Sequence, residues 1–134
     1  LRVGWAMGNP NLIQGLCCVR DSINSYTVDR LAQAGAAAAV EDEDYFTQTC
    51  QKVMATRERT AQRLLEMGYT VLPSQANFLF VSHPDKSGKA LLDGLRERGV
   101  LVRWWSNPAI SNWLRISIGT DAEMDTLLSA LQEL

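Results

Sequence analysis

The clearest hydrophobic pattern in the chain lies in residues 113–120, where apolar and polar side chains alternate up to a glycine and a threonine. A period of two is that of a β-strand, so Leu114 and Ile116 face one side of a sheet while Arg115 faces the other. The segment therefore predicts a strand that holds a guanidinium on a rigid element, where it can bind an anion through two N–H groups. A surface arginine whose stem covers the sheet is the alternative interpretation.

The C-terminal half of the chain has the pattern of a compact α+β unit. The predicted strands are 69–72, 77–81, 100–105 and 113–118, and the predicted helices are 87–98 and one that begins at 121. The last helix starts with a capping box, in which Thr120 and Glu123 satisfy free backbone N–H groups of the first turn. Strands in one layer and helices in the other predict a two-layer sandwich, with a mainly antiparallel sheet and helices on one face.

The N-terminal half is predicted to be mostly helical. Asn9 and Pro10 have the residue types that open a helix, and Gly68 has the type that ends one in a left-handed conformation. The expected segments are a strand at 1–8, a helix from 10, a polar loop at 21–26, an alanine-rich helix at 28–40 and a long helix at 45–67.

The long helix at 45–67 has an apolar stripe that includes Phe46 and Leu65. Its arginines, Arg57, Arg59 and Arg63, fall outside this stripe and are expected in solvent.

Composition narrows the class of protein. The 134 residues include 46% hydrophobic and 21% charged ones, and the net charge is −2, as in ordinary soluble proteins. There is no run of basic residues to bind nucleic acid and no apolar stretch long enough for a membrane span, so neither partner is expected. The chain also begins without an initiator methionine or a signal-like segment, and we expect it to be cut from a longer, cytoplasmic protein.

The cysteines and the single histidine indicate neither a disulfide framework nor a metal site. Cys17 and Cys18 are adjacent and Cys50 is isolated, which fits neither a disulfide framework nor a metal site. Free cysteines of this kind are typical of a reducing compartment. His83 precedes a proline in a turn and is expected to be structural, so no metal ligand set is predicted.

Arg103 and Arg115 are best interpreted as a pair. In residues 100–105 the alternation places Arg103 and Trp105 on one face of a strand. If this strand pairs with the one that carries Arg115, the two guanidiniums converge, and their mutual repulsion is relieved by a phosphate or a carboxylate between them. The connecting segment 106–112 either shapes the rim of that site or is a plain hairpin connection.

Five motifs in register resemble the C-terminal part of histidinol-phosphate aminotransferases, pyridoxal-phosphate enzymes of fold type I. The motifs are Leu1-Arg2-Val3-Gly4-Trp5, Asn24-Ser25-Tyr26 leading into Asp29-Arg30-Leu31-Ala32-Gln33, Leu72-Pro73-Ser74-Gln75-Ala76-Asn77-Phe78, Gly99-Val100-Leu101-Val102-Arg103 and Leu114-Arg115-Ile116-Ser117-Ile118-Gly119-Thr120. The resemblance covers essentially the whole chain.

The resemblance implies roles for individual residues. Arg2 matches the arginine of the Leu-Arg-x-Gly motif, which contacts the cofactor phosphate in this family. Arg115 matches the arginine that takes the substrate carboxylate or helps with other anionic groups, and Arg103 matches one that binds the substrate phosphate. Asn77 and Tyr26 lie in matching motifs and are assigned to the rim of the substrate site or a dimer-facing loop, although a turn-capping amide and a surface aromatic explain them equally well.

The resemblance also implies what the chain lacks. The lysine that forms the Schiff base in this family precedes the Leu-Arg-x-Gly motif, and Lys52, Lys86 and Lys89 lie outside all five motifs. No catalytic residue is therefore assigned, and the chain is expected to be inactive alone. The implied organisation is the tail of the α/β cofactor-binding domain at 1–40, a connecting helix at 41–68 and a small domain at 69–134.

The expected function is that of a fragment of a pyridoxal-phosphate-dependent aminotransferase, most closely histidinol-phosphate transaminase of histidine biosynthesis. The implied partners are small molecules, namely histidinol phosphate and the 2-oxoglutarate/glutamate pair, and a second subunit in a homodimer. Three alternatives stay open: a transaminase for aromatic or other amino acids, an amino-acid-phosphate decarboxylase, and a non-catalytic interaction domain.

Overall fold

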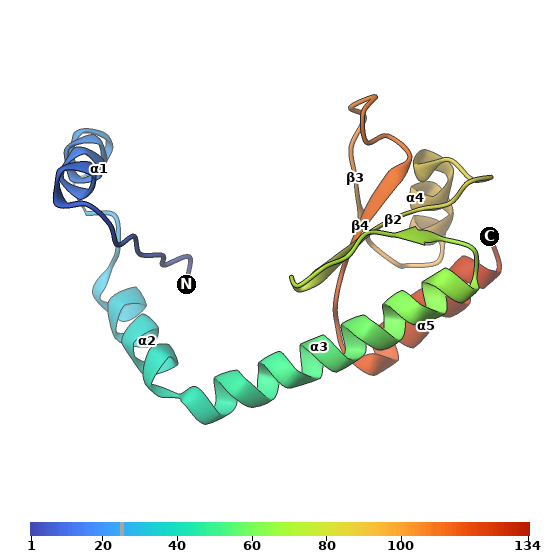
Figure 1. Ribbon diagram of the computed structural model, residues 1–134, viewed down its shortest axis with the longest axis horizontal. Coiled ribbons are helices and arrows are strands. Elements are labelled where there is room, and N and C mark those ends of the chain that lie inside the picture. Colours follow the sequence, from blue (N-terminus) through green and yellow to red (C-terminus); the bar gives the residue numbers. More distant parts are fainter. Residues whose placement is uncertain (25) are drawn as a thin grey trace. The chain divides into compact units, whose positions relative to one another are not determined.

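The computed structural model describes residues 1–24 and 26–134. In order along the chain, its elements are α1 (Pro10–Ile23), α2 (Arg30–Glu41), α3 (Glu43–Glu66), β1 (Thr70–Val71), β2 (Phe78–Ser82), α4 (Gly88–Glu97), β3 (Arg103–Trp104), β4 (Trp113–Ser117) and α5 (Asp121–Gln132) (Figure 1). The chain divides into two compact units, Leu1–Thr47 and Gln48–Leu134. Among the described residues, no helix combines the length and apolar character that crossing a membrane requires.

The first unit differs from the sequence prediction at its start. Residues 1–9 form neither helix nor strand, so the strand expected at 1–8 is wrong. A strand needs a neighbour for its backbone N–H and C=O groups, and this segment has no such neighbour among the described residues. Arg2 instead has a φ of 57°, in the left-handed region.

The helices of the first unit begin as expected. The side chain of Asn9 accepts a hydrogen bond from the backbone N–H of Asn11 at 2.9 Å, and Pro10 occupies the first turn of α1. The helix continues to Ile23, so the polar loop expected at 21–26 is wrong for its first three residues, and Ser25 lies outside the described residues. Asp29 caps α2 by accepting from the N–H of Ala32 at 2.8 Å.

The second unit contains a four-stranded antiparallel sheet in the order β1-β2-β4-β3. The alternation read from the sequence is present in both long strands. Leu79 and Val81 of β2 and Leu114 and Ile116 of β4 are at most 1% exposed, whereas the residues between them are half-buried. The α+β class and the antiparallel sheet predicted from the sequence are confirmed.

Helices cover the apolar face of this sheet (Figure 1). Their contributions to the common core are Leu64 of α3, Leu91 and Leu95 of α4, and Met124, Leu127, Leu128, Ala130 and Leu131 of α5. The predicted capping box opens α5: the Thr120 side chain accepts from the Glu123 N–H at 3.3 Å, and the Glu123 carboxylate accepts from the Thr120 N–H at 2.7 Å. The opposite face of the sheet is left for other contacts.

The expectation of a solvated set of arginines on α3 is wrong for Arg57. This side chain is buried and donates from Nη1 to the backbone carbonyl of Ala76 at 3.1 Å. The carbonyl belongs to the turn before β2, and a buried donor and acceptor stabilise each other only when they are paired. Conversely, Phe46 and Leu65, expected in the apolar stripe, are 61% and 51% exposed.

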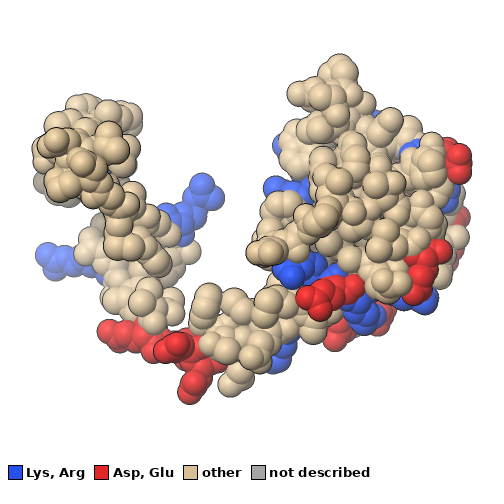
Figure 2. Space-filling model, viewed as in Figure 1, with Lys and Arg blue, Asp and Glu red and all other residues tan. Residues whose placement is uncertain are grey.

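Arg59 also forms ion pairs. It contacts Asp121 at 3.1 Å and Asp125 at 2.5 Å, which ties α3 to α5. Figure 2 shows acidic and basic side chains interleaved over the region where these two helices lie in Figure 1. Such exposed pairs orient the helices and contribute little stability.

Candidate functional site

The face of the sheet away from the core carries two arginines and four aromatic rings. The alternation of β2 and β4 places Phe78, Phe80, Trp113 and Arg115 on this face, and Arg103 and Trp105 come from β3 and the residue that follows it. An aliphatic core occupies one side of the sheet, and a cationic and aromatic surface occupies the other.

Arg103 and Arg115 are direct register partners across β3 and β4. The strand pairing that the sequence suggested is therefore present, although β3 comprises only two residues and not the six expected at 100–105. Side chains opposite each other in an antiparallel pair lie on the same face at close range. The register thus brings together two of the sequence-predicted site residues.

The guanidiniums lie against aromatic rings. The Cζ atom of Arg115 is 5.5 Å from the centre of the Phe78 ring and 5.7 Å from that of Trp105, and the Cζ atom of Arg103 is 5.4 Å from the centre of Trp105. These distances are within the range of cation–π attraction. Trp105 thus contacts both cations.

Arg115 has an unsatisfied donor. Its Nε atom is buried and has no hydrogen-bond partner. Neither Arg115 nor Arg103 takes part in any ion pair among residues 1–24 and 26–134. A buried donor without an acceptor costs free energy, and an anion that accepts from it would recover that cost.

The aromatic rings support one another. Phe80 stacks on Trp113 with their centroids 5.1 Å apart, and it meets Trp105 edge-on at 6.2 Å. Offset and edge-to-face contacts of this kind fix ring orientation as well as bury area. The cationic pair therefore lies on a packed aromatic surface.

The segment 106–112 is held at its far end. The indole N–H of Trp104 donates to the carbonyl of Ser111 at 2.7 Å, and a Cβ added to Gly88 would stand 2.6 Å from that same oxygen. At the near end, the side chain of Asn107 accepts from the N–H of Ala109 at 3.0 Å. The segment is thus a structured connection next to Trp105.

Asn77 lies in the same unit as the two arginines. Its backbone carbonyl accepts from the N–H of Ile118 at 2.9 Å, which extends the β2–β4 ladder, and its side chain is exposed. Tyr26, 93% exposed, and Arg2, also exposed, belong to the first unit. The second unit therefore brings Arg103 and Arg115 together.

Sequence reasoning assigned no role to two residues of this surface, Phe78 and Trp105. The signal for Trp105 was present, since alternation placed it on the face of Arg103. Phe78 follows Asn77 in one of the quoted motifs and occupies an outward position on β2.

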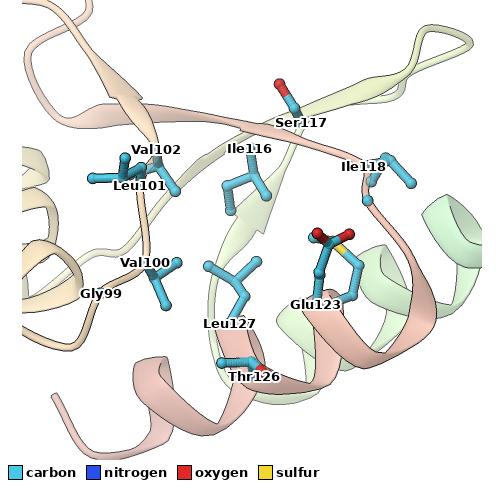
Figure 3. A pocket seen from close by; sticks show the side chains of 12 residues that line it. Gly99, Val100, Leu101, Val102, Ile116, Ser117, Ile118, Glu123, Thr126 and Leu127 are labelled. Atoms are coloured by element: carbon cyan, nitrogen blue, oxygen red, sulfur yellow. The ribbon is translucent and has the colours of Figure 1, made fainter.

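A separate cavity of about 350 Å³ lies between residues 99–102, the end of β4 and the start of α5. Figure 3 shows the side chains of Val100, Ile116 and Leu127 pointing toward one another there. Neither arginine lines this cavity, and the described residues contain no group of three potential metal ligands.

His83 packs edge-on against Tyr69 with the ring centroids 4.8 Å apart, and its Nδ1 accepts from the N–H of Asp85 at 3.1 Å. Burial raises the pKa of the Tyr69 hydroxyl. These contacts agree with a structural role for the histidine.

Sequence comparison places the chain among known proteins. A family model described as aminotransferase class I and II matches residues 1–131. The histidinol-phosphate aminotransferase of Clostridium acetobutylicum is 49% identical over 133 residues, which cover 99% of this chain and 38% of the relative. Histidinol-phosphate aminotransferase 2 of Thiobacillus denitrificans is 51% identical over 135 residues, covering 100% and 38%. The chain spans 38% of the length of these curated relatives.

A solved structure of a histidinol-phosphate aminotransferase also matches this chain. The histidinol-phosphate aminotransferase from Sinorhizobium meliloti, in complex with pyridoxal-5'-phosphate, matches with a TM-score of 0.82 and 30% identity, over 95% of this chain and 34% of that one. An L-threonine-O-3-phosphate decarboxylase from Porphyromonas gingivalis, at 22% identity and a TM-score of 0.57, covers 62% of this chain and 27% of that one and shares the fold alone.

Proposed function

The chain belongs to the aminotransferase class I and II family, and we propose that it forms the C-terminal part of a pyridoxal-phosphate-dependent histidinol-phosphate aminotransferase of histidine biosynthesis. The observation that carries the proposal is the cross-strand pair of Arg103 and Arg115, neither of which has a carboxylate partner among the described residues. Two adjacent cations with an unsatisfied donor form a receptor for a multivalent anion.

Arg103 and Arg115 divide the work of substrate binding in this proposal. Arg103 is the more exposed of the two and binds the phosphate of histidinol phosphate. Arg115, half-buried on the central part of the sheet, helps to hold this anion and takes the carboxylate of the amino-acid partner, glutamate. Asn77 at the end of the ladder lies at the rim of the site. A guanidinium on a strand is a rigid group, so its contribution is to orient the substrate.

The residues of the first unit fit a phosphate-bearing cofactor. The backbone of Arg2 is held in the left-handed region, its side chain is exposed, and the ion pairs of the described residues do not include it. It would hold the phosphate of pyridoxal 5'-phosphate, and Tyr26 would lie in a loop that faces the second subunit. When bound, the cofactor supplies the electron sink for amino-group transfer.

The proposed organisation has three parts: the tail of the cofactor-binding domain at 1–40, a connecting helix at 41–68 and the small domain at 69–134. The lysine that binds the cofactor is contributed from outside these residues, and the chain alone is inactive. The intact enzyme is a cytoplasmic homodimer in this proposal.

The test is substrate selectivity of the full-length aminotransferase that contains this chain. Transamination of histidinol phosphate and of phenylalanine by 2-oxoglutarate is measured for the wild type and for Arg103→Ala. We expect kcat/KM for histidinol phosphate to fall by about tenfold to a hundredfold, as for loss of one charge-assisted contact, with a much smaller change for phenylalanine.

Arg96→Ala is the matched control, since Arg96 is exposed in the last turn of α4. It should leave both substrates unaffected. Equal losses for both substrates in Arg103→Ala would contradict a phosphate-binding role. Release of CO2 from an added amino acid that carries a phosphate, with no transamination of histidinol phosphate, would identify a decarboxylase instead.

A further inference from the structure

The ring of Trp105 lies within cation–π range of both arginines of the candidate site. We propose that Trp105 is a positioning residue, whose indole holds the Arg103 and Arg115 guanidiniums together so that both donate to one anion. The proposal rests on the proposed function, because it concerns the same anion site.

The two guanidiniums repel each other, so a further group is needed to hold them together. They carry the same charge on opposing residues of β3 and β4, and like charges directly across a strand pair repel. Without an anion they would separate into solvent, and each binding event would have to bring them back. The electron-rich face of an indole attracts a cation, and a shared ring attracts both. Trp105 therefore lowers the cost of assembling the site before the anion arrives.

Attraction to an aromatic face leaves a guanidinium able to bind an anion. Its N–H donors lie at the edge of its plane and are not consumed when its flat face meets a ring. The Nε of Arg115 is buried and has no acceptor, so this donor has already left bulk water. What the ring supplies is position, and the anion supplies the hydrogen-bond acceptors.

No other ring of the described residues does this. Phe78 is in cation–π range of Arg115 alone, and Trp113 stacks on Phe80 and forms no cation–π pair among the described residues. Trp104 is partly buried against the core and donates its indole N–H to Ser111. Trp113 is therefore a matched control for Trp105, with an equally large ring on the same face.

Trp105 also lies where its replacement spares the fold. It follows β3, which ends at Trp104, so its backbone is outside the strand pairing. It is not a member of the hydrophobic core. A change at this position is thus expected to alter the arginines more than the sheet.

The experiment uses the full-length aminotransferase that contains this chain, with inorganic phosphate as the probe. The Nε–H resonances of the arginines are followed by NMR in the wild type, Trp105→Leu, Trp105→Phe and Trp113→Leu. In the free enzyme, ring-current shifts of the Arg103 and Arg115 side chains should be lost in Trp105→Leu and kept in Trp113→Leu. Phosphate affinity should fall about threefold to fivefold in Trp105→Leu and change less than twofold in Trp105→Phe and Trp113→Leu.

Fluorinated tryptophans at position 105 guard against misfolding. Added fluorines keep the shape of the ring and weaken its electron-rich face, so phosphate affinity should fall step by step with the number of fluorines. The same series at position 113 should have no effect. Affinity that is indifferent to fluorination at 105, or equal in Trp105→Leu and the wild type, overturns the role of Trp105 and leaves the anion site intact.

A different result would contradict the proposed function itself. If neither arginine of the wild-type enzyme responds to phosphate, or if Arg103→Ala and Arg115→Ala bind phosphate as the wild type does, there is no anion site at this pair. Both proposals then fail together. The response of the wild-type arginines therefore separates failure of the site from failure of Trp105.

Discussion

Arg103 on β3 faces Arg115 on β4 as its direct cross-strand partner. A sheet gains nothing from this arrangement by itself, because opposed like charges weaken a strand pair. The pair is supported by aromatic rings and lacks any carboxylate partner among the described residues. The proposed role of this arginine pair is therefore to bind an anion.

If the two arginines share one anion, their effects are coupled. In the full-length enzyme we expect Arg103→Ala and Arg115→Ala each to lower kcat/KM for histidinol phosphate, and the double variant to lose less than the sum of the two losses in activation free energy. Steady-state kinetics of the four enzymes gives the coupling energy. Strict additivity would mean that the guanidiniums bind separate groups.

The role of Arg2 is tested by cofactor affinity. Arg2→Ala in the full-length enzyme should weaken pyridoxal-phosphate binding by about 1.5–3 kcal/mol, as expected for a charge-assisted contact. Equilibrium dialysis against the cofactor measures the change, and circular dichroism shows that the fold is kept. Arg20→Ala is the control, since Arg20 pairs with Asp21 on α1, and it should bind the cofactor normally. An unchanged dissociation constant for Arg2→Ala would remove this assignment.

Helix α1 presents an apolar stripe that predicts self-association. Leu12, Leu16, Val19 and Ile23 recur at helical spacing and are 58–79% exposed, and α1 has no buried residue. We expect the chain to form dimers or larger species, and Leu16→Glu to shift it toward monomer. Sedimentation at several concentrations measures this. Gln14→Glu adds the same charge on the same helix and should not dissociate the assembly, and a strictly monomeric wild type at high concentration would contradict the prediction.

Acid should weaken the start of α5. The pKa of Asp121 is lowered, first by the hydrogen bond from Thr56 and then by Arg59, and the pKa of Glu123 is lowered by the backbone N–H of Thr120. Carboxylates with a folded-state pKa below the unfolded value stabilise the fold above the unfolded pKa, near 4, and lose this effect as the pH falls through the folded value.

The measurement is the midpoint of thermal unfolding between pH 7 and pH 2. The wild type should lose stability below about pH 4, whereas Asp121→Asn and Glu123→Gln should start lower at pH 7 and lose less on acidification. Asp85→Asn is the control, since this exposed carboxylate takes part in no ion pair among the described residues. Parallel pH profiles for all four chains would contradict the linkage.

The elements that sequence predicted well are those fixed by local chemistry. The capping box at Thr120 and Glu123 is complete within four residues, and the alternation around Leu114 and Arg115 needs only that one face of the sheet be covered. Both features are visible in the sequence because their causes lie within a few residues.

The elements that it missed depend on distant partners. Arg57 is buried because a carbonyl 19 residues away accepts a hydrogen bond from it. No residue near position 57 in the sequence indicates that acceptor. The segment 1–8 has the composition of a strand, but a strand forms only beside another strand. The shared contact of Trp105 with two arginines depends on the β3–β4 register, which no local pattern specifies.

The carbonyl of Ser111 is fixed from two directions, by the indole N–H of Trp104 and by the close approach of Gly88, which has no room for a side chain. The connection between β3 and β4 is therefore held in place at its Ser111 end. Insertions and deletions among relatives should accumulate at its tip, near Pro108, and be rare beside Ser111. Changes in loop length near Pro108 can thus occur with the β3–β4 register of Arg103 and Arg115 left undisturbed.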